Sequence, residues 1–216
     1  MRVLVLCDDR WHPASTARAG LAPLEGSDFT FDWIEDARDW TAERLQTYPV
    51  VLLTKSNNVS LKDEAPWVDA TVGRAFVDFV GAGGGLLALH SGTAGYRDQP
   101  ELRGLLGGVF DHHPPQCAVT VAPSAEPGLA AGISPFTVTD EHYMIVLDDP
   151  HAAVFLQTTS EHGTQPGGWT RREGHGRVCV LTPGHLTEVW LHPNYQTLIR
   201  NGLRWVGLRS GREFRD

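Results

Sequence analysis

Short apolar runs alternate with amphipathic segments along the first hundred residues. Residues 3–7, 50–54 and 86–89 are almost wholly apolar, which is typical of strands that are covered on both faces. Residues 29–34 alternate and predict a further strand. Apolar positions at helical spacing predict helices between these runs, over residues 15–24, 41–48, 65–80 and 100–106. Strand and helix therefore alternate, which predicts an α/β fold of the flavodoxin-like, doubly wound kind, with a mostly parallel sheet.

The pattern changes from Gln116 onward, where strand-like stretches follow one another with short turns between them. These stretches are residues 117–121, 136–147, 153–158 and 177–182. We expect some of them to pair antiparallel and to extend the sheet. Apolar positions over residues 195–208 predict a closing helix. Because no linker-like composition interrupts the chain, we predict a single domain over residues 1–216.

Composition and charge narrow the classes of partner. The chain is 41% hydrophobic and 20% charged, as in ordinary globular proteins. Its formal net charge of -8 argues against nucleic acid or an anionic membrane as partner, because both attract positive charge. Cys7, Cys117 and Cys179 are widely spaced, which disfavours a disulfide framework and a thiolate zinc site. We see no secretory signal and no apolar stretch of the ~20 residues that span a bilayer, so we expect a cytoplasmic protein.

Reactive side chains follow several of the predicted strands. His12 comes shortly after the first strand, His90 and Ser91 come directly after the fourth, and His185 follows the last. Ligands in open α/β sheets bind beyond the carboxyl ends of the parallel strands. We therefore expect these side chains to face one cleft.

The stretch Gly-Gly-Gly-Leu-Leu-Ala-Leu-His-Ser-Gly (83–92) has the pattern of a nucleophile elbow. A buried strand enters a tight turn with a reactive side chain at its tip and a glycine two residues later. The tip is His90, which can act as a base, an acid or a metal ligand. A structural turn with a hydrogen-bonded histidine is the alternative. No glycine-rich phosphate-binding motif and no His-Glu-x-x-His motif occurs, so neither a nucleotide cofactor nor that kind of zinc site is supported.

Two further polar clusters lie outside these strand ends. Residues 111–114 place His113 in a predicted loop, where a solvated side chain is the alternative to a functional one. Residues 140–143 lie inside a strand-like run, in which alternation puts Glu141 and Tyr143 on the same face. Such polar groups are costly to bury without partners, and an exposed edge strand is the alternative.

Six stretches, in this order and spacing, resemble the ThuA-like (trehalose utilisation) family, whose fold is that of the class I glutamine amidotransferases. They are GGGLLALHSG (83–92), LLGGVFDHHP (105–114), DEHY (140–143), GWTR (168–171), GRVCVLTPGH (176–185) and NGLRW (201–205). Amidotransferases of this fold carry a cysteine at the elbow. Because His90 occupies that position here, the resemblance does not imply glutaminase activity.

The resemblance implies a role in sugar catabolism. We expect a hydrolase, or a lyase or isomerase, that acts on a keto-glycoside or disaccharide by acid–base chemistry. His90 or Glu141 is the expected base, and His185 or His113 the expected acid. Side chains expected to bind the sugar are His12, Ser91, Asp140, Tyr143 and Trp169.

No cofactor is required by this chemistry, but histidines and a carboxylate also suit a divalent metal such as Zn²⁺. The candidate ligands are His90, His113, Glu141 and His185. The alternative function is a non-catalytic sugar-binding or regulatory domain that kept an amidotransferase-like scaffold, since a fold alone does not establish activity. The sequence leaves open the exact substrate, the bond acted on and whether the chain forms a homo-oligomer.

Overall fold

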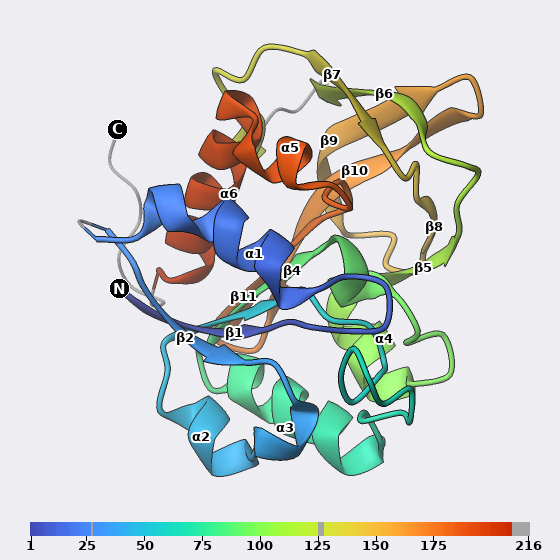
Figure 1. Ribbon diagram of the computed structural model, residues 1–216. Coiled ribbons are helices and arrows are strands. Elements are labelled where there is room, and N and C mark those ends of the chain that lie inside the picture. The colour runs from blue at the N-terminus through green and yellow to red at the C-terminus, as the bar shows by residue number, and fades with distance from the viewer. Residues whose placement is uncertain (27, 125–127, 209–216) are drawn as a thin grey trace.

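The computed structural model, which describes residues 1–26, 28–124 and 128–208, contains a nine-stranded sheet with the order β2-β1-β3-β4-β11-β10-β9-β6-β7 (Figure 1). Neighbouring strands from β2 to β11 are parallel. This half has the predicted flavodoxin-like order. Its strands are β1 (Arg2–Leu6), β2 (Thr30–Ile34), β3 (Val50–Leu53), β4 (Gly85–Leu89) and β11 (Gly176–Leu181).

Helices cover both faces of the parallel half (Figure 1). One face carries α1 (Ala14–Leu21), α5 (Thr187–Leu191) and α6 (Pro193–Val206). The other face carries α2 (Ala42–Gln46), α3 (Ala70–Gly81) and α4 (Pro100–Leu106). Short 3-10 turns are η1 (Ala22–Leu24), η2 (Ala37–Asp39), η3 (His90–Thr93) and η4 (Gly128–Ala130). None of the described helices combines the length and the apolar character needed to cross a bilayer.

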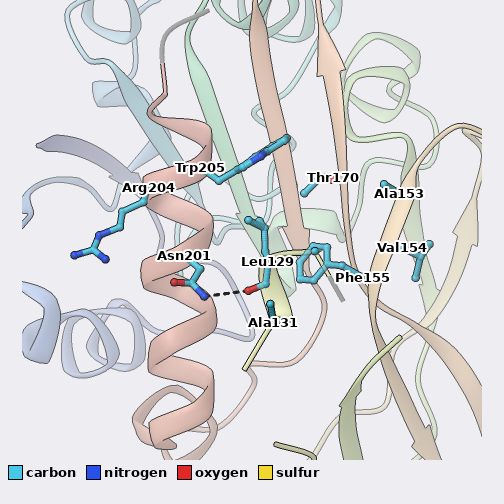
Figure 2. Close-up of a pocket in the computed structure, with 10 residues that line it drawn as sticks. Leu129, Ala131, Ala153, Val154, Phe155, Thr170, Asn201, Arg204 and Trp205 are labelled. Carbon is cyan, nitrogen blue, oxygen red and sulfur yellow. Dashed lines mark hydrogen bonds between the residues drawn. The ribbon is translucent and has the colours of Figure 1, made fainter. Parts of the chain in front are cut away.

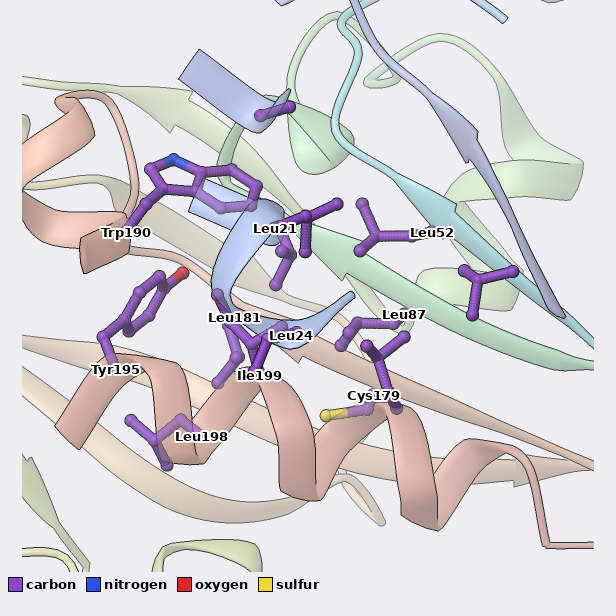
Figure 3. Packing of buried hydrophobic residues seen from close by; sticks show 14 of the residues in the cluster. Leu21, Leu24, Leu52, Leu87, Cys179, Leu181, Trp190, Tyr195, Leu198 and Ile199 are labelled. Carbon is purple, nitrogen blue, oxygen red and sulfur yellow. The ribbon is translucent and has the colours of Figure 1, made fainter. Parts of the chain in front are cut away.

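Successive side chains of the central strands enter two different cores, which explains their unbroken apolar runs. In β4, Leu87 and Leu89 pack in the core beneath α1, α5 and α6, while Leu86 and Ala88 pack beneath α2, α3 and α4. Figure 3 shows Leu87 among side chains of α6 and β11. All four residues are fully buried, and burying one leucine side chain contributes roughly 1.5–3 kcal/mol. The central strands are therefore a rigid base for the loops at their ends.

The chain continues the sheet beyond β11 with antiparallel strands, as predicted. Their order is β10 (Gly163–Glu173), β9 (Ala153–Ser160), β6 (Cys117–Pro123) and β7 (Phe136–Asp140). Strand β10 was absent from the sequence prediction, because a proline and a glycine pair interrupt its polar sequence. The structure accommodates them by register shifts between Pro166 and Trp169.

The predicted strand over residues 136–147 is wrong in one respect that matters for function. It breaks at residues 141–143 into β7 and β8 (Met144–Leu147), which pair with different strands. The partner of β8 is β5 (Gly108–His112), a segment that the sequence predicts as a loop. Alternation therefore does not set the directions of the side chains in the break.

Candidate functional site

The loop after β1 is folded around the carboxylate of Asp9. This buried group accepts hydrogen bonds from the backbone N–H groups of Trp11, His12 and Ser56 and from Nδ1 of His12 at 2.8 Å. Burial by itself raises the pKa of Asp9, but the His12 ring and the backbone donors lower it to about 2. Asp9 is therefore a carboxylate at neutral pH, and it fixes the orientation of the His12 ring.

His90 lies in a strained turn at the end of β4. Its backbone φ is 45°, a left-handed value that costs about 1–3 kcal/mol in a non-glycine residue. Gly92 allows the turn to close, since a Cβ atom there would lie 2.1 Å from the carbonyl oxygen of Leu53. The ring Nδ1 donates to the carbonyl oxygen of Thr182 at 2.8 Å. The predicted tight turn is present with His90 at its tip, while the hydrogen bond to Thr182 also fits the alternative of a structural turn with a hydrogen-bonded histidine.

The loop after β11 is held by the carboxylate of Asp140, at the end of β7. Its two oxygens accept from the backbone N–H groups of Gly184, at 2.8 Å, and His185, at 3.0 Å. Nε1 of Trp190 donates to the Gly184 carbonyl at 2.6 Å. Asp140 is fully buried, and burial raises its pKa. The prediction that Asp140 binds substrate is therefore wrong: it positions the loop that carries His185.

Glu141 is the meeting point of the cluster. Its carboxylate oxygens lie 3.4 Å from Nε2 of His90, 3.3 Å from Nδ1 of His185 and 3.5 Å from Nε2 of His113. Burial by itself raises the pKa of Glu141, but His185 and His90 lower it well below its usual range. The same contact with Glu141 raises the pKa of His185. The structure thus brings all four predicted catalytic residues together.

His12 belongs to this cluster more closely than the sequence indicates. Its ring lies edge-on to His90 and His185, with ring centroids 4.9 and 5.1 Å away. Burial lowers the pKa of His12, although Asp9 opposes this effect. One donor atom from each of four side chains lies within 4.8 Å of the other three: His12, His90, Glu141 and His185.

A cavity of about 800 Å³ opens above the cluster. It falls within the roughly 300–1,000 Å³ typical of small-molecule sites. Its lining residues are Trp11, His12, Ser56, Asn57, Asn58, Glu64, Pro66, Ala94, Gly95, Phe110, His113, Glu141, Tyr143 and His185. His90 lies beneath this lining with 1% of its surface exposed, and the Tyr143 ring stacks on it at 4.0 Å between centroids.

Besides Asp140, two further residues that were predicted to bind sugar do not reach the cavity. Trp169 is fully buried in the core under α4, where Nε1 donates to the carbonyl oxygen of Leu106 at 2.8 Å. Ser91 is also fully buried and does not belong to the lining of the cavity. Both predictions are wrong. The sequence prediction missed two aromatic residues of the cavity lining, Phe110 and Trp11. Trp11 is 66% exposed and lies directly before His12.

A second cavity of about 720 Å³ lies between α6 and the β9–β10 face (Figure 2). Its described lining is mostly apolar, with Leu129, Phe155 and Trp205 among it, and Asn201 donates to the Leu129 carbonyl at 3.0 Å. The Arg204 side chain points away from the cavity (Figure 2) and pairs with an aspartate. No histidine and no carboxylate belongs to the described part of this lining, so the acid–base groups belong to the cavity above Glu141.

Comparison with known proteins supports the α/β fold described above. A family profile described as ThuA, trehalose utilisation, matches residues 2–206. A ThuA-like protein from Bacteroides uniformis has a TM-score of 0.75 at 20% identity, covering 95% of this chain and 91% of that one. One from Parabacteroides merdae has a TM-score of 0.74 at 14% identity, covering 99% and 92%.

A β-galactosidase from Rahnella sp. R3 has a TM-score of 0.65 at 18% identity, covering 94% of this chain and 31% of that one. The shared fold is thus one part of a larger enzyme in that case. No curated protein matches the chain at a significant level.

Proposed function

Because the chain belongs to the trehalose-utilisation family, we propose that it is an enzyme of sugar catabolism that acts on a keto-glycoside or keto-disaccharide. The observation that carries the proposal is the convergence of imidazoles on the Glu141 carboxylate, at the floor of a cavity of sugar size. Convergent acid–base groups inside one cavity are the usual signature of an active centre. We also propose a cytoplasmic location, which suits the three free cysteines.

A ketone on the sugar ring makes the protons on the neighbouring carbon acidic. A base, His90 or Glu141, takes the proton from the carbon between the ketone and the glycosidic carbon. The glycosidic C–O bond then breaks with its electron pair on oxygen, and an acid protonates that oxygen. The products are an unsaturated keto-sugar and a free sugar, and addition of water to the former completes a net hydrolysis.

His113 suits the acid role better than His185. Its side chain is 35% exposed at the cavity mouth, and Nδ1 donates to the carbonyl oxygen of Pro114 at 2.8 Å. That bond leaves Nε2 facing the cavity beside Glu141. A leaving-group oxygen that enters from solvent meets His113 before it meets the deeper His185.

The cavity also offers groups that recognise a sugar. The exposed indole of Trp11 can stack on a pyranose ring, and Asn57, whose Oδ1 accepts from the backbone N–H groups of Trp67 and Val68, offers its amide N–H groups to a ligand. Tyr143 remains a proposed binding residue, since it lines the cavity beside Glu141. A mostly apolar wall with a few convergent polar groups is the usual form of a small-molecule site.

The experiment is a turnover assay with a panel of keto-disaccharides and their unoxidised counterparts, among them trehalose. We expect the wild-type protein to release free sugar from a keto-substrate, and His113→Gln to lose roughly 100- to 10,000-fold in rate, the usual contribution of a general acid. His112→Gln is the matched control, because His112 is exposed and outside the cavity lining.

Absence of turnover on every sugar, together with measurable sugar binding, would instead support the non-catalytic sugar-binding domain. Equal rates for His113→Gln and His112→Gln would remove His113 from the acid role. A pH–rate profile separates a catalyst from a binder, since only a catalyst has a rate that depends on its own acid and base.

A further inference from the structure

We propose that the floor of the cavity is a binding site for one divalent transition-metal ion. The ligands are His12, His90, Glu141 and His185. This site deepens the proposed function, on which it rests only in that the ion and the sugar would share one cavity. With the ion bound, Nε2 of His90 would be a ligand, so the base would be the second carboxylate oxygen of Glu141. It differs from the ligand set expected from sequence, because His12 replaces His113.

Hydrogen bonds at the far side of two rings fix which nitrogen faces the cluster. Nδ1 of His12 donates to the Asp9 carboxylate, and Nδ1 of His90 donates to the Thr182 carbonyl, both at 2.8 Å. Each neutral ring therefore presents an unprotonated Nε2 to the cluster. Metal-binding histidines in proteins are oriented by the same two kinds of partner, a carboxylate or a backbone carbonyl.

Three ring nitrogens at this point are buried and, among the described residues, have no hydrogen-bond partner: His12 Nε2, His90 Nε2 and His185 Nδ1. His90 itself is almost wholly shielded from solvent, with 1% of its surface exposed. Unpaired buried nitrogens are costly, and lone pairs that face a carboxylate repel it. A single proton can form a hydrogen bond between the Glu141 carboxylate and only one of these ring nitrogens. A divalent cation, by contrast, attracts the carboxylate and all three nitrogens.

The separations suit a first coordination shell. Two ligands bound at ~2.1 Å to a tetrahedral ion lie about 3.4 Å apart. The Glu141 oxygens lie 3.4 Å from Nε2 of His90 and 3.3 Å from Nδ1 of His185. All four donor atoms fall within 4.8 Å of one another, so small side-chain rotations are enough to close the shell. Three of the ligands come from the segments that follow β1, β4 and β11.

The donor set selects the class of ion. Imidazole nitrogens suit Zn²⁺, Fe²⁺, Ni²⁺ or Cu²⁺, and a carboxylate adds Mn²⁺, whereas Mg²⁺ and Ca²⁺ prefer oxygen ligands. His113 lies nearer the solvent, outside the group of four. It therefore stays free beside the open face of the site. A bound ion would polarise a substrate carbonyl there as a Lewis acid.

The experiment measures metal binding directly on the full chain, purified without a histidine tag and stripped with a chelator. The probes are Zn²⁺, Mn²⁺, Ni²⁺ and Co²⁺, followed by elemental analysis, calorimetry and the visible spectrum of bound Co²⁺. We expect about one ion per chain and a Co²⁺ spectrum of nitrogen and oxygen ligands. Ca²⁺ and Mg²⁺ should bind at least about tenfold more weakly than the tightest transition ion.

Variants then identify the ligands. His12→Gln and Glu141→Gln should weaken binding by more than about tenfold, while His113→Gln and His112→Gln should keep it unchanged. The melting temperature without metal shows whether each variant folds. Failure of the folded wild-type protein to bind any of the four ions at micromolar concentration would overturn the proposal, as would loss of the ion in His113→Gln with retention in His12→Gln.

The sugar assay separates this inference from the proposed function. Turnover by the stripped protein at the wild-type rate, in a protein that then binds none of the four probe ions, would leave the enzyme standing and reject the metal site. A stoichiometric ion without turnover of any sugar would leave the metal site standing and reject the proposed activity. The two failures are therefore distinguishable.

Discussion

At the scale of single residues, the backbone determines where the reactive side chains lie. His90 has a left-handed φ, and the glycine two positions later lies against the end of β3. Asp140 fixes the backbone at His185, and Asp9 fixes the ring of His12. These contacts hold the reactive groups in fixed positions. Catalysis requires such groups to be held close to the geometry in which they react.

Gly92→Ala should destabilise the protein by about 1–3 kcal/mol or more, the range of an overpacked core. The reason is that its Cβ atom would lie 2.1 Å from a backbone oxygen, which no side-chain rotation can relieve. Gly104→Ala is the control, since it lies inside α4 and a Cβ atom added there would meet nothing within 4 Å. That change should be neutral or stabilising by ~0.5–1 kcal/mol. Denaturant unfolding of both variants measures the difference, and equal losses would contradict the expectation.

Asp140→Asn should lower kcat strongly while the protein stays folded. An amide can accept at only one of its two former carboxylate oxygens, so one N–H of the Gly184–His185 loop loses its partner, at a cost of about 1–3 kcal/mol. A shift of His185 by ~1 Å can lower a catalytic rate about 100-fold. Steady-state kinetics should show this loss in kcat rather than KM. A purely structural role would instead leave kcat per folded molecule unchanged.

Trp169→Phe should lower stability and leave KM for sugar unchanged. The indole of Trp169 is buried and donates to the Leu106 carbonyl at the end of α4, so its loss leaves that carbonyl without this donor. We expect a cost of about 1–3 kcal/mol. By contrast, Trp11→Ala should raise KM, because Trp11 is exposed at the cavity rim. A raised KM in Trp169→Phe would show that the core assignment is wrong.

At the scale of elements, a strand could be predicted from the sequence when both of its faces are buried. The strands buried on both faces were predictable, because their apolar runs are short and unbroken. Strand β10 was not, since its proline and glycines read as a turn and only the bulge makes them compatible with pairing. The strand over residues 136–147 was predicted whole, because no turn residue marks the break at residues 141–143.

An ion pair joins α4 to the residue that follows β8. Arg103 donates to both carboxylate oxygens of Asp148, at 2.7 and 2.8 Å. These hydrogen bonds lower the pKa of Asp148. A lowered pKa in the folded state means that the stabilisation is present above the unfolded-state pKa of about 3.9 and is lost as pH falls through the folded-state value.

Asp148→Asn should therefore cost about 0.2–1 kcal/mol at pH 7, the range of exposed ion pairs. The difference from wild type should shrink as pH falls below about 4. Urea unfolding at several pH values checks both statements. A difference that stays constant or grows toward acid pH would contradict them.

At the scale of the whole molecule, the candidate site combines two halves of the sheet. The order of the parallel strands brings the ends of β1, β4 and β11 to one edge, so His12, His90 and His185 were predictable from strand position. Glu141 was not, because it comes from the break between β7 and β8, in the antiparallel half. Its place in a polar cluster inside a strand-like run and in the family motif pointed to it, but its contact with three histidines depends on how that half folds over the edge.

The most direct measurement is the rate of sugar release from a keto-disaccharide by wild type and by Glu141→Gln, in a protein whose folding is checked by its melting temperature. Since Glu141 is the group on which the histidines converge, the variant should bind the sugar and lose nearly all turnover. A wild-type protein that releases sugar at a rate which Glu141→Gln matches would contradict the claim that this cluster is the catalytic centre.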